Sequence, residues 1–501
     1  MDSVINLLNG FATALNGWNI LYCVIGVTVG MLVGILPGLG PVTAIALLLP
    51  ITFKLDAIPA IIMLAGIYYG SMYGGTVTSV LINVPGEAAS VVTCFDGYAM
   101  AKQGRAGTAL GVAAIGSFIG GTVAVIGLTL IGPPLARFAL GFGPQEFFAI
   151  MVLGLAMLMG LIGKSLIRGM LSAFIGLSIA LIGMDPMTGL LRFTFGEPNL
   201  MEGLDFVVIA MGLFGISEVM LGYEASGSSV PITRISKLFP ERHEWKPTMG
   251  AIGRGTVLGF FLGLIPGANA VIASVLSYSL EKKISKDPSR FGHGAIEGVA
   301  GPETANNAFS GAAMIPLFTM GLPTSPTVAI LFGAFIMHGL TPGPALFQSN
   351  PDLVWGIIAS MYIGNVVLLI FNLPLARLWA KITLVPESIM YPAIVAISVV
   401  GAYSVSGSLF QVGVMIISGI VGYIFKKVDI PLAPLVLTFV LGKLMESTLA
   451  QSMIYFEGNF LLFFTRPIAG TVLVIAILVL VFSIVSVIKG KRGRLASDTE
   501  I

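Results

Sequence analysis

Two apolar stretches of this sequence carry a Pro-Gly break at nearly the same place. Residues 34–43 read GILPGLGPVT and residues 263–272 read GLIPGANAVI. Membrane segments tolerate such breaks where the freed backbone groups face protein, water or a ligand. A helix that restarts after a break presents unpaired N–H groups and a partial charge of roughly +0.5 at its N-terminus. This arrangement favours the binding of an anion, such as a carboxylate, without a full cationic side chain.

Two later Gly/Pro clusters repeat the pattern. Residues 82–90 read INVPGEAAS and residues 320–328 read MGLPTSPTV. Each cluster should end one helix and start another, so it offers further free N–H groups beside hydroxyl and amide side chains. We therefore predict a substrate site built from the four broken segments, with the residues Gly38, Gly40, Pro41, Thr43, Asn83, Pro85, Gly86, Gly267, Asn269, Gly321, Pro323, Thr324 and Ser325.

Oxygen-bearing side chains near the same clusters suit a small cation such as Na⁺, which the broken helices of transporters also coordinate through free carbonyls. The candidate ion ligands are Asn83, Glu87, Asn306, Asn307 and Thr319. Glu87 has an equally good interpretation as a carboxylate at the membrane interface. The polar run GPETANNAFSG at 301–311 is expected to line the approach to the second Gly/Pro cluster.

Other chemistries find little support in the residue pattern. The three histidines are scattered and the two cysteines form no CxxC motif, so neither a disulfide framework nor a metal site is indicated. The sequence has no Ser/His pair, GxGD pair or HExxH motif, which disfavours an intramembrane enzyme. It also has no GxxxxGK[ST] loop for ATP phosphates. We expect no cofactor beyond a coupling Na⁺ or H⁺, and no nucleic-acid partner.

The elements that must hold these residues are membrane helices. Of the 501 residues, 56% are hydrophobic and 10% charged, and the mean hydropathy is +0.97. Soluble domains have about 25% charged residues. Apolar segments of about 20 residues recur along the chain, which indicates an all-α polytopic membrane protein in a lipid bilayer. We predict about 11 full spans, at 60–82, 108–132, 143–163, 165–184, 202–222, 308–338, 354–376, 386–404, 409–425, 430–450 and 468–488.

The positions of Lys and Arg set the predicted orientation. The C-terminal tail is basic and is therefore placed in the cytoplasm. Both flanks of 254–280 are cytoplasmic by the same rule, so this stretch is predicted to be a re-entrant hairpin with limbs of about 12 residues, or ~18 Å of helix, each. With this hairpin, all but five of the 26 Lys and Arg residues lie on the cytoplasmic side, the exceptions being Lys54, Arg137, Arg192, Lys443 and Arg466.

The two halves of the chain resemble each other. Aligning Pro37 with Pro266 pairs the two Pro-Gly breaks, and a further shift pairs 82–90 with 320–328. The stretch 20–52 is a second hairpin that opens to the outside, opposite to 254–280, and such inverted repeats are typical of secondary transporters. We predict a first repeat at 1–222 with an interrupted span at 60–100, a cytoplasmic linker at 223–253, a second repeat at 254–450 with an interrupted span at 308–338, and an extra span with a basic tail at 451–501.

Two local contacts are also predicted. Lys443 and Glu446 lie three residues apart in one span and should form an ion pair. The small residues at 111–121, which include a GxxxG at 116–120, should mark a close helix contact.

Four stretches of the sequence resemble a known family. GILPGLGPVTAIALLLP, GLIPGANA, GPETANNA and MGLPTSPTVAIL are similar to the signature stretches of the large membrane subunit of tripartite tricarboxylate transporters, the TctA family. The resemblance covers nearly the whole chain. It implies a periplasmic solute-binding protein and a small membrane subunit of about four spans as partners. It also implies uptake of citrate or a related carboxylate, driven by Na⁺ or H⁺, in the bacterial inner membrane. The second tip, PGANA, is less glycine-rich than the first, PGLGP, so the two tips need not bind equally.

The expected mechanism is elevator-type alternating access, in which the paired hairpins move as a unit against the remaining helices. A carboxylate/cation symporter without a binding protein remains an alternative, and so does a channel, because some channels share paired re-entrant loops. An intramembrane enzyme is the alternative from another class.

Overall fold

The computed structural model describes residues 2–36, 39–161, 165–185, 187–225, 237–375, 378–379 and 387–488. Within these ranges the chain is almost entirely helical, apart from one short antiparallel ribbon of β1 (Gly183–Met184) and β2 (Leu191–Arg192). Nine of the described helices are long and apolar enough to cross a membrane, which confirms a helical multi-pass membrane protein. Pro37 and Gly38 of the first Pro-Gly break and the basic C-terminal tail lie outside the described residues. So do four of the residues counted above as cytoplasmic, namely Lys164, Arg234, Arg377 and Lys381.

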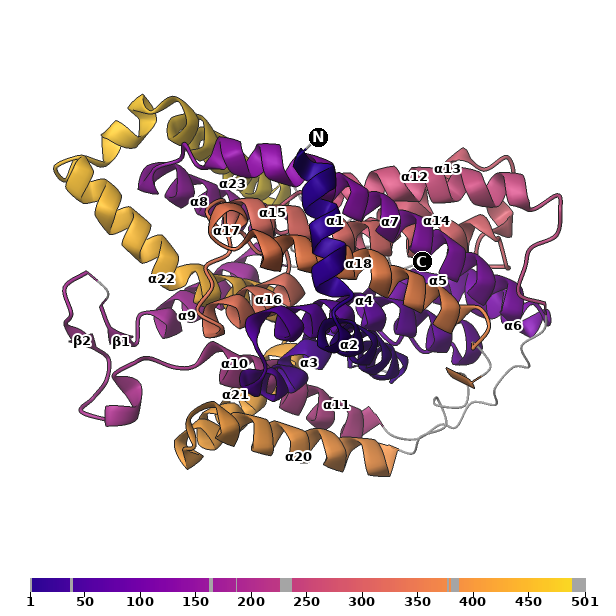
Figure 1. Cartoon of the computed structure of the whole chain (residues 1–501), viewed down its shortest axis with the longest axis horizontal. Helices are drawn as coiled ribbons and strands as arrows, with labels where there is room; N and C mark the ends of the chain where they lie inside the picture. Colours follow the sequence, from indigo (N-terminus) through magenta and orange to yellow (C-terminus); the bar gives the residue numbers. More distant parts are fainter. Residues whose placement is uncertain are drawn as a thin grey trace.

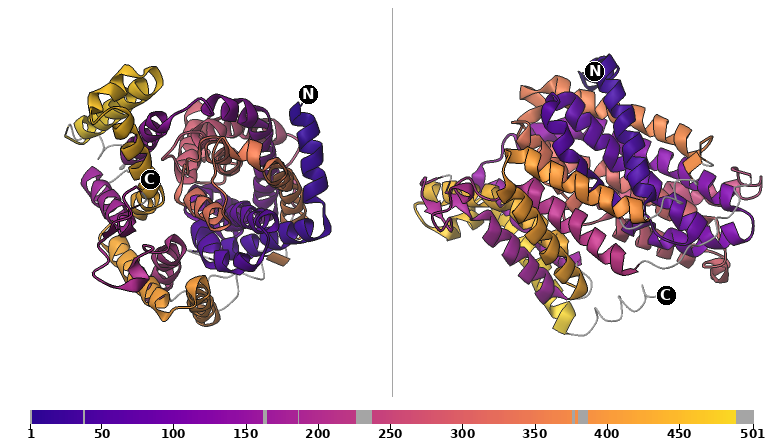
Figure 2. Two further views of the ribbon diagram at one scale, coloured as in Figure 1. Left: turned by 60° about the vertical axis from the view of Figure 1, so that its left-hand side comes forward. Right: turned by 90° about the horizontal axis from the view of Figure 1, so that it is seen from below.

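The helices form two groups, which we name the inner bundle and the outer arc (Figures 1 and 2). The first half of the chain supplies to the bundle α1 (Asp2–Ala14), α2 (Gly17–Ile35), α3 (Gly40–Leu48), η1 (Leu49–Lys54), α4 (Ala57–Ile82), η2 (Ala88–Ser90), α5 (Val91–Thr93), η3 (Cys94–Tyr98), α6 (Ala99–Lys102) and α7 (Ala106–Ala139). The second half supplies α12 (Trp245–Gly263), α13 (Ala270–Ile284), η6 (Pro288–Arg290), α14 (Glu297–Ala312), α15 (Met314–Met320), α16 (Pro326–Met337), α17 (Leu346–Ser349) and α18 (Pro351–Asn372).

The outer arc lies along one side of the bundle, as the left view of Figure 2 shows. It contains α8 (Pro144–Leu161), α9 (Leu166–Ala180), η4 (Pro198–Leu200), α10 (Phe206–Ala210), η5 (Met211–Ile216), α11 (Ser217–Ala225), α20 (Glu387–Ser406), α21 (Leu409–Lys427), α22 (Leu432–Tyr455), η7 (Phe460–Thr465) and α23 (Pro467–Ile488). Helices α3 and α16 of the bundle pack against both groups, since α3 contacts η5 and α16 contacts α22.

Glycines let the bundle helices approach closely in both halves. In α2, Gly26, Gly30 and Gly34 face α4, and a Cβ added at any of them would lie 2.2–2.4 Å from a carbonyl oxygen of α4. In α12, Gly255, Gly259 and Gly263 face α14 in the same way, with Cβ positions 2.2–2.6 Å from carbonyl oxygens. These are the small-residue contacts by which membrane helices pack without a hydrophobic driving force. The two triads superimpose in sequence when Pro37 is aligned with Pro266.

The two halves interlock through their longest helices. Helix α7 of the first half packs on α14 and α12 of the second, and α18 of the second half packs on α4 and α2 of the first. The predicted GxxxG contact lies in this interface, because Cβ atoms at Gly116 and Gly120 would lie 2.3 Å and 2.6 Å from Thr304 atoms of α14. The bundle therefore has one continuous core shared by both halves.

Eight of the nine candidate spans coincide with predicted spans, and the ninth, Gly17–Ile35, overlaps the first part of the predicted hairpin at 20–52. The predicted spans 143–163 and 165–184 correspond to the shorter apolar helices α8 and α9. The prediction of limbs of about 12 residues for 254–280 is wrong, because α12 has 19 residues and α13 has 15. Helix α12 is longer than predicted because it begins at Trp245, in a more polar segment that precedes the apolar stretch.

The interrupted span predicted at 308–338 begins earlier. Its first part is α14, which starts at Glu297 and is followed directly by α15. The run GPETANNAFSG is therefore buried within a helix of the bundle core, and of its residues only Phe309 is among the described residues that line the cavity, so the expected polar approach is wrong. The periodic placement of its small and polar residues against α7 and α12 explains why so polar a segment is a buried helix.

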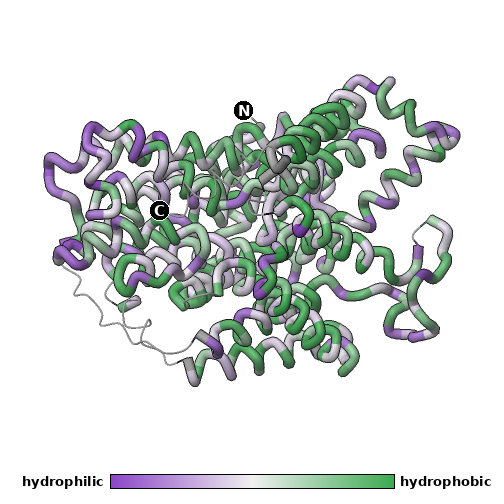
Figure 3. Tube along the Cα trace, turned by 180° about the vertical axis from the view of Figure 1, so that it is seen from behind, coloured by the Kyte–Doolittle hydropathy of each residue, from purple (hydrophilic) through white to green (hydrophobic). Residues whose placement is uncertain are grey.

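Burial separates the inner from the outer helices. In α4, 83% of the most apolar window is buried, whereas for α20, α21 and α23 the share is 28%. The outer helices carry exposed Ile, Leu, Val and Phe side chains. In Figure 3 the trace of the helices is mostly coloured as hydrophobic, and the hydrophilic colour gathers mainly at loops and helix ends. A surface of this kind suits contact with lipid.

The predicted ion pair between Lys443 and Glu446 is wrong. Glu446 instead pairs with Arg192 of the β-ribbon, with Nη2 and Oε2 2.9 Å apart. The Lys443 amine donates to the carbonyl of Glu202 at 3.3 Å. Both side chains therefore anchor the 183–205 loop to α22, a long-range contact that helical spacing does not reveal.

Candidate functional site

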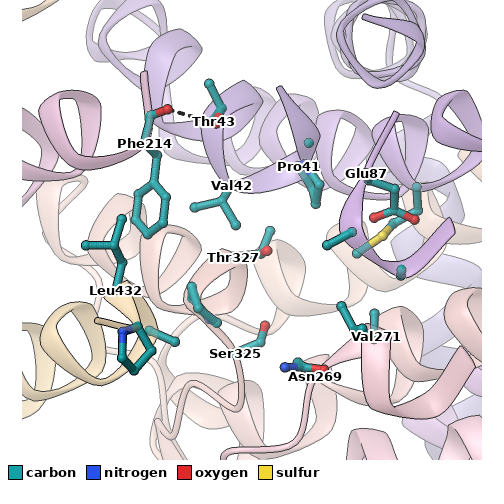
Figure 4. A pocket seen from close by; sticks show the side chains of 18 of the residues that line it. Pro41, Val42, Thr43, Glu87, Phe214, Asn269, Val271, Ser325, Thr327 and Leu432 are labelled. Atoms are coloured by element: carbon teal, nitrogen blue, oxygen red, sulfur yellow. Dashed lines mark hydrogen bonds between the residues drawn. The ribbon is translucent and has the colours of Figure 1, made fainter. Parts of the chain in front are cut away.

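A cavity of about 600 Å³ lies where the four broken segments meet. Its wall includes residues 39–43, 85–89, 267–271 and 325–327 from the inner bundle, and the outer arc closes it with Phe214 and residues 430–433. Figure 4 shows side chains from these segments around one open space. The four Gly/Pro segments, far apart in the chain, thus contribute to a single site.

The first wall is the start of α3. Gly40 has φ +50° and Pro41 follows in the first turn, where a proline costs no hydrogen bond. Thr43 donates from its hydroxyl to the carbonyl of Phe214 at 3.2 Å, the dashed line in Figure 4. This hydrogen bond joins α3 of the bundle to η5 of the arc.

The second wall is the start of α13. Asn269 is its N-cap, and its side-chain oxygen accepts from the Ile272 N–H at 2.9 Å. Gly267 has φ +85° and donates its N–H to the Thr324 carbonyl at 3.0 Å, so this tip is tied directly to the second interruption. A Cβ at Gly267 would lie 2.4 Å from the backbone of Leu158, which leaves no room for a side chain.

The two interruptions share one backbone geometry. The residue that follows α4, Asn83, has φ 58°, and the residue that follows α15, Gly321, has φ 67°, so both lie in the left-handed region. Four residues later, Glu87 (φ −138°, ψ 161°) and Ser325 (φ −143°, ψ 164°) are extended and precede the next helical segment. Ser325 caps α16 by accepting from the Val328 N–H at 3.4 Å. The left-handed position directly after a helix is usually occupied by Gly and less often by Asn, as it is here.

The cavity gathers most, but not all, of the predicted site residues. Those that line it are Gly40, Pro41, Thr43, Pro85, Gly86, Glu87, Gly267, Asn269 and Ser325. Those that lie outside its lining are Asn83, Gly321, Pro323, Thr324, Asn306, Asn307 and Thr319. Gly38 lies outside the described residues.

A buried polar layer lies behind the Glu87 wall. The Asn306 amide donates to Glu87 Oε1 at 2.6 Å, and the Asn307 amide donates to the Ser117 hydroxyl at 2.7 Å. Glu303, one turn before these residues, accepts from Thr76 at 2.6 Å and from Thr93 at 2.5 Å. Thr319 is turned to its own helix, where it donates to the Ile315 carbonyl. Glu303 was not predicted, although its spacing from Asn306 and Asn307 places all three on one helix face.

Charges at the cavity are few. Among the described residues that line it, the charged side chains are Glu87, Glu218 and Lys426. Glu218 and Lys426 form an ion pair with each other at the arc side. No group of three or more His, Cys, Asp or Glu side chains that could hold a metal ion occurs in the part of the chain that the structure describes. The polar partners offered to a ligand are therefore backbone N–H groups, hydroxyls and one amide.

Comparison with known proteins gives a consistent result. The family described as "Tripartite tricarboxylate transporter TctA family" matches residues 20–437. A protein of Agrobacterium vitis, named "Uncharacterized 52.8 kDa protein in TAR-I ttuC' 3'region", is 46% identical over 495 residues, 99% of each chain. A second A. vitis protein, "Uncharacterized protein in TAR-II ttuC' 3'region", is 48% identical over 236 residues, which are 47% of this chain and 98% of that one. No solved structure matches.

Proposed function

Because this chain belongs to the tripartite tricarboxylate transporter TctA family as the large membrane subunit, we propose that its cavity carries an organic carboxylate across the bilayer together with Na⁺ or H⁺. The chain is thus a transporter subunit and not an enzyme. Citrate or a related tricarboxylate is the substrate class that we propose.

The observation that carries the proposal is the convergence of the four broken segments on one cavity. Helices α3, α13 and α16 all begin at its wall. Among the described residues that line the cavity, the one basic side chain, Lys426, is already paired, so the backbone N–H groups in the first turns of these helices are the donors that favour a carboxylate. A volume of about 600 Å³ also lies in the usual range for small-molecule sites.

We further propose that the two halves are inverted repeats with paired hairpins. The matching glycine triads of α2 and α12 support a repeat, as do the equivalent backbone geometries at Asn83 and Gly321. The distribution of Lys and Arg supports opposite orientations and a cytoplasmic C-terminus. In an inverted-repeat transporter the substrate lies at the repeat interface, where this cavity is.

An elevator-type mechanism is supported by the position of the cavity between the inner bundle and the outer arc. All four broken segments belong to the bundle, whereas Phe214 and residues 430–433 belong to the arc. We propose that the bundle segments carry the substrate past the arc. A periplasmic solute-binding protein would deliver the carboxylate, and a small membrane subunit would complete the complex in the bacterial inner membrane.

Uptake into proteoliposomes that contain this chain and the small subunit tests the proposal. A panel of radiolabelled tri- and dicarboxylates is offered with and without the binding protein, and with and without a Na⁺ or H⁺ gradient. We expect saturable uptake that requires the binding protein and a cation gradient. Uptake without the binding protein would identify a stand-alone symporter, and unsaturable flux would identify a channel.

Two substitutions separate the role of Asn269 in capping from a role in binding. Asn269→Ser retains a capping oxygen, whereas Asn269→Asp retains the cap but adds a negative charge at the cavity wall. We expect KM to rise at least tenfold in Asn269→Asp and only a few-fold in Asn269→Ser.

A second comparison uses alanine variants. Thr324→Ala, outside the cavity lining, should reduce uptake less than Asn269→Ala. Normal uptake in all four folded variants would contradict the site.

A further inference from the structure

Glu87 is a buried carboxylate with no basic partner among the residues that the structure describes. It lines the cavity and is 5% exposed. One of its oxygens accepts from the Asn306 amide at 2.6 Å, and a second buried acid, Glu303, lies one turn before Asn306 on α14. The ion pairs between described residues join Glu218, Glu281 and other acids to Lys, Arg or His, but none of them includes Glu87.

The site next to Glu87 also contains unused oxygen atoms. Asn306 Oδ1 and the Tyr68 hydroxyl are both fully buried, and neither forms a hydrogen bond of normal geometry, although the hydroxyls of Ser310 and Ser325 lie near the Tyr68 oxygen. Tyr68 lines the same cavity, and the amide of Asn306 already touches Glu87. Buried polar atoms are nearly always satisfied, so two orphans beside one unpaired carboxylate indicate an absent ligand. The two orphan oxygens come from α14 and α4, one from each half of the bundle.

These atoms define the chemistry of that ligand. Carboxylate, amide and hydroxyl oxygens are the donors that hard cations prefer. An isolated carboxylate within a membrane protein is costly until it is neutralised by a proton or paired with a cation. An anionic substrate in the same cavity would raise this cost, because like charges in a medium of low dielectric constant repel strongly.

We propose that Glu87, with Asn306 and Tyr68, holds one monovalent cation, either Na⁺ or a proton, and that the cavity accepts its carboxylate only when this cation is in place. This inference rests on the proposed function and names the site that couples the two ligands. The cation offsets the charge of Glu87, so each ligand strengthens the binding of the other by the same factor.

The titratable groups around Glu87 are few. Tyr68 lies on α4 and Glu303 on α14, and the Glu218–Lys426 pair lies at the arc side of the cavity. Glu303 already receives two hydroxyl donors, from Thr76 and Thr93, and does not line the cavity. Of these groups, Glu87 alone is a carboxylate that lines the cavity and has no ion-pair partner among the described residues.

Direct cation binding to the purified full-length protein tests the inference without any carboxylate. Binding of ²²Na⁺ is measured at pH 8, and proton release is measured on a jump from pH 5 to pH 9. We expect one bound Na⁺ per chain in the wild type, or one proton more released per chain than in Glu87→Gln, because the histidines and the N-terminus release protons over this range in both proteins. Glu87→Gln should abolish that Na⁺ binding or remove that proton. Glu281→Gln is the matched control, because Glu281 is also buried but already paired with Arg254.

Each outcome decides the inference. Unchanged binding and proton release in Glu87→Gln, or their loss in Glu303→Gln with retention in Glu87→Gln, would overturn it. If Glu87→Gln does not fold, Glu87→Asp, which withdraws the carboxylate by one methylene, must shift the cation affinity at least several-fold. An unchanged affinity in that variant also overturns it.

Coupling to substrate is measured separately. The affinity for the transported carboxylate should rise at least tenfold with saturating cation in the wild type and not in Glu87→Gln. If cation binding depends on Glu87 but no carboxylate is bound or transported, the proposed function fails and the cation site remains. If carboxylate uptake remains cation-dependent in Glu87→Gln, the cation site fails and the proposed function remains.

Discussion

At the scale of single residues, Asp96 holds the two halves of the bundle together on the side of the 285–297 loop. Its side chain is completely buried and accepts from the backbone N–H groups of Gly292, Gly294 and Ala295 at 2.7–2.9 Å. The Tyr278 hydroxyl donates to its other oxygen at 2.9 Å. One carboxylate thus satisfies three backbone donors of a loop almost 200 residues away in the chain.

Asp96→Ala should destabilise the protein by about 2–4 kcal/mol, because it leaves buried N–H groups without an acceptor. Asp96→Asn should cost less, since the amide retains one acceptor oxygen. Thermal unfolding in detergent, followed by circular dichroism, measures both. Asp287→Ala in the same loop is the control, because Asp287 is exposed and only caps Ser289. Equal stability of Asp96→Ala and Asp287→Ala would contradict this role.

At the scale of helices, close packing depends on glycines whose neighbours are backbone atoms. Such neighbours cannot rotate away, so the cost of an added methyl group depends on position within one helix. Helix α12 provides a direct comparison. A Cβ at Gly259 would lie 2.2 Å from the Ala305 carbonyl oxygen, whereas a Cβ at Gly253 meets nothing within 4 Å.

Gly259→Ala should therefore cost about 1–3 kcal/mol through overpacking. Gly253→Ala should be neutral or stabilising by up to ~1 kcal/mol, because alanine favours the helix. The midpoint temperatures of the two variants, measured under identical conditions, test the contact. If Gly253→Ala lowers the midpoint temperature more than Gly259→Ala does, the close α12–α14 contact does not determine which glycines of α12 tolerate a methyl group.

At the scale of the whole molecule, the proposed mechanism requires the inner bundle to slide against the outer arc. Leu47 of α3 meets Gly215 of η5 across this boundary, where a Cβ at Gly215 would lie 3.6 Å from Leu47 Cγ. Within the bundle, a Cβ at Gly301 would lie 2.9 Å from Ser277 Oγ. Both pairs are close enough for a disulfide.

In a background without Cys23 and Cys94, oxidation of the Leu47→Cys/Gly215→Cys pair should reduce uptake more than tenfold, and reduction should restore it. Oxidation of Ser277→Cys/Gly301→Cys should leave most uptake intact. The fraction of cross-linked protein is measured on the same vesicles by mass spectrometry. Full activity of the completely oxidised bundle–arc pair would exclude sliding at this boundary.

The sequence by itself determined the class of the protein, the breaks in its helices and nine of the residues at the cavity wall. These follow from local physics: apolar length specifies a membrane helix, and Pro and Gly specify where a helix ends. The outlines of eight spans were predicted for the same reason. The helical spacing of Glu303 and the glycine triads of α2 and α12 were also present in the sequence, but nothing local distinguishes them from other polar or small residues in a chain with 63 glycines.

Only the tertiary structure decided which of these residues meet. It joined Asn306 to Glu87, Arg192 to Glu446 and Asp96 to the 285–297 loop, all across more than 190 positions. It placed Thr324 and Asn83 outside the cavity lining and buried 301–311 in the core. Such pairings depend on how whole helices pack, because a side chain's partner is set by the neighbouring helix and not by its own segment.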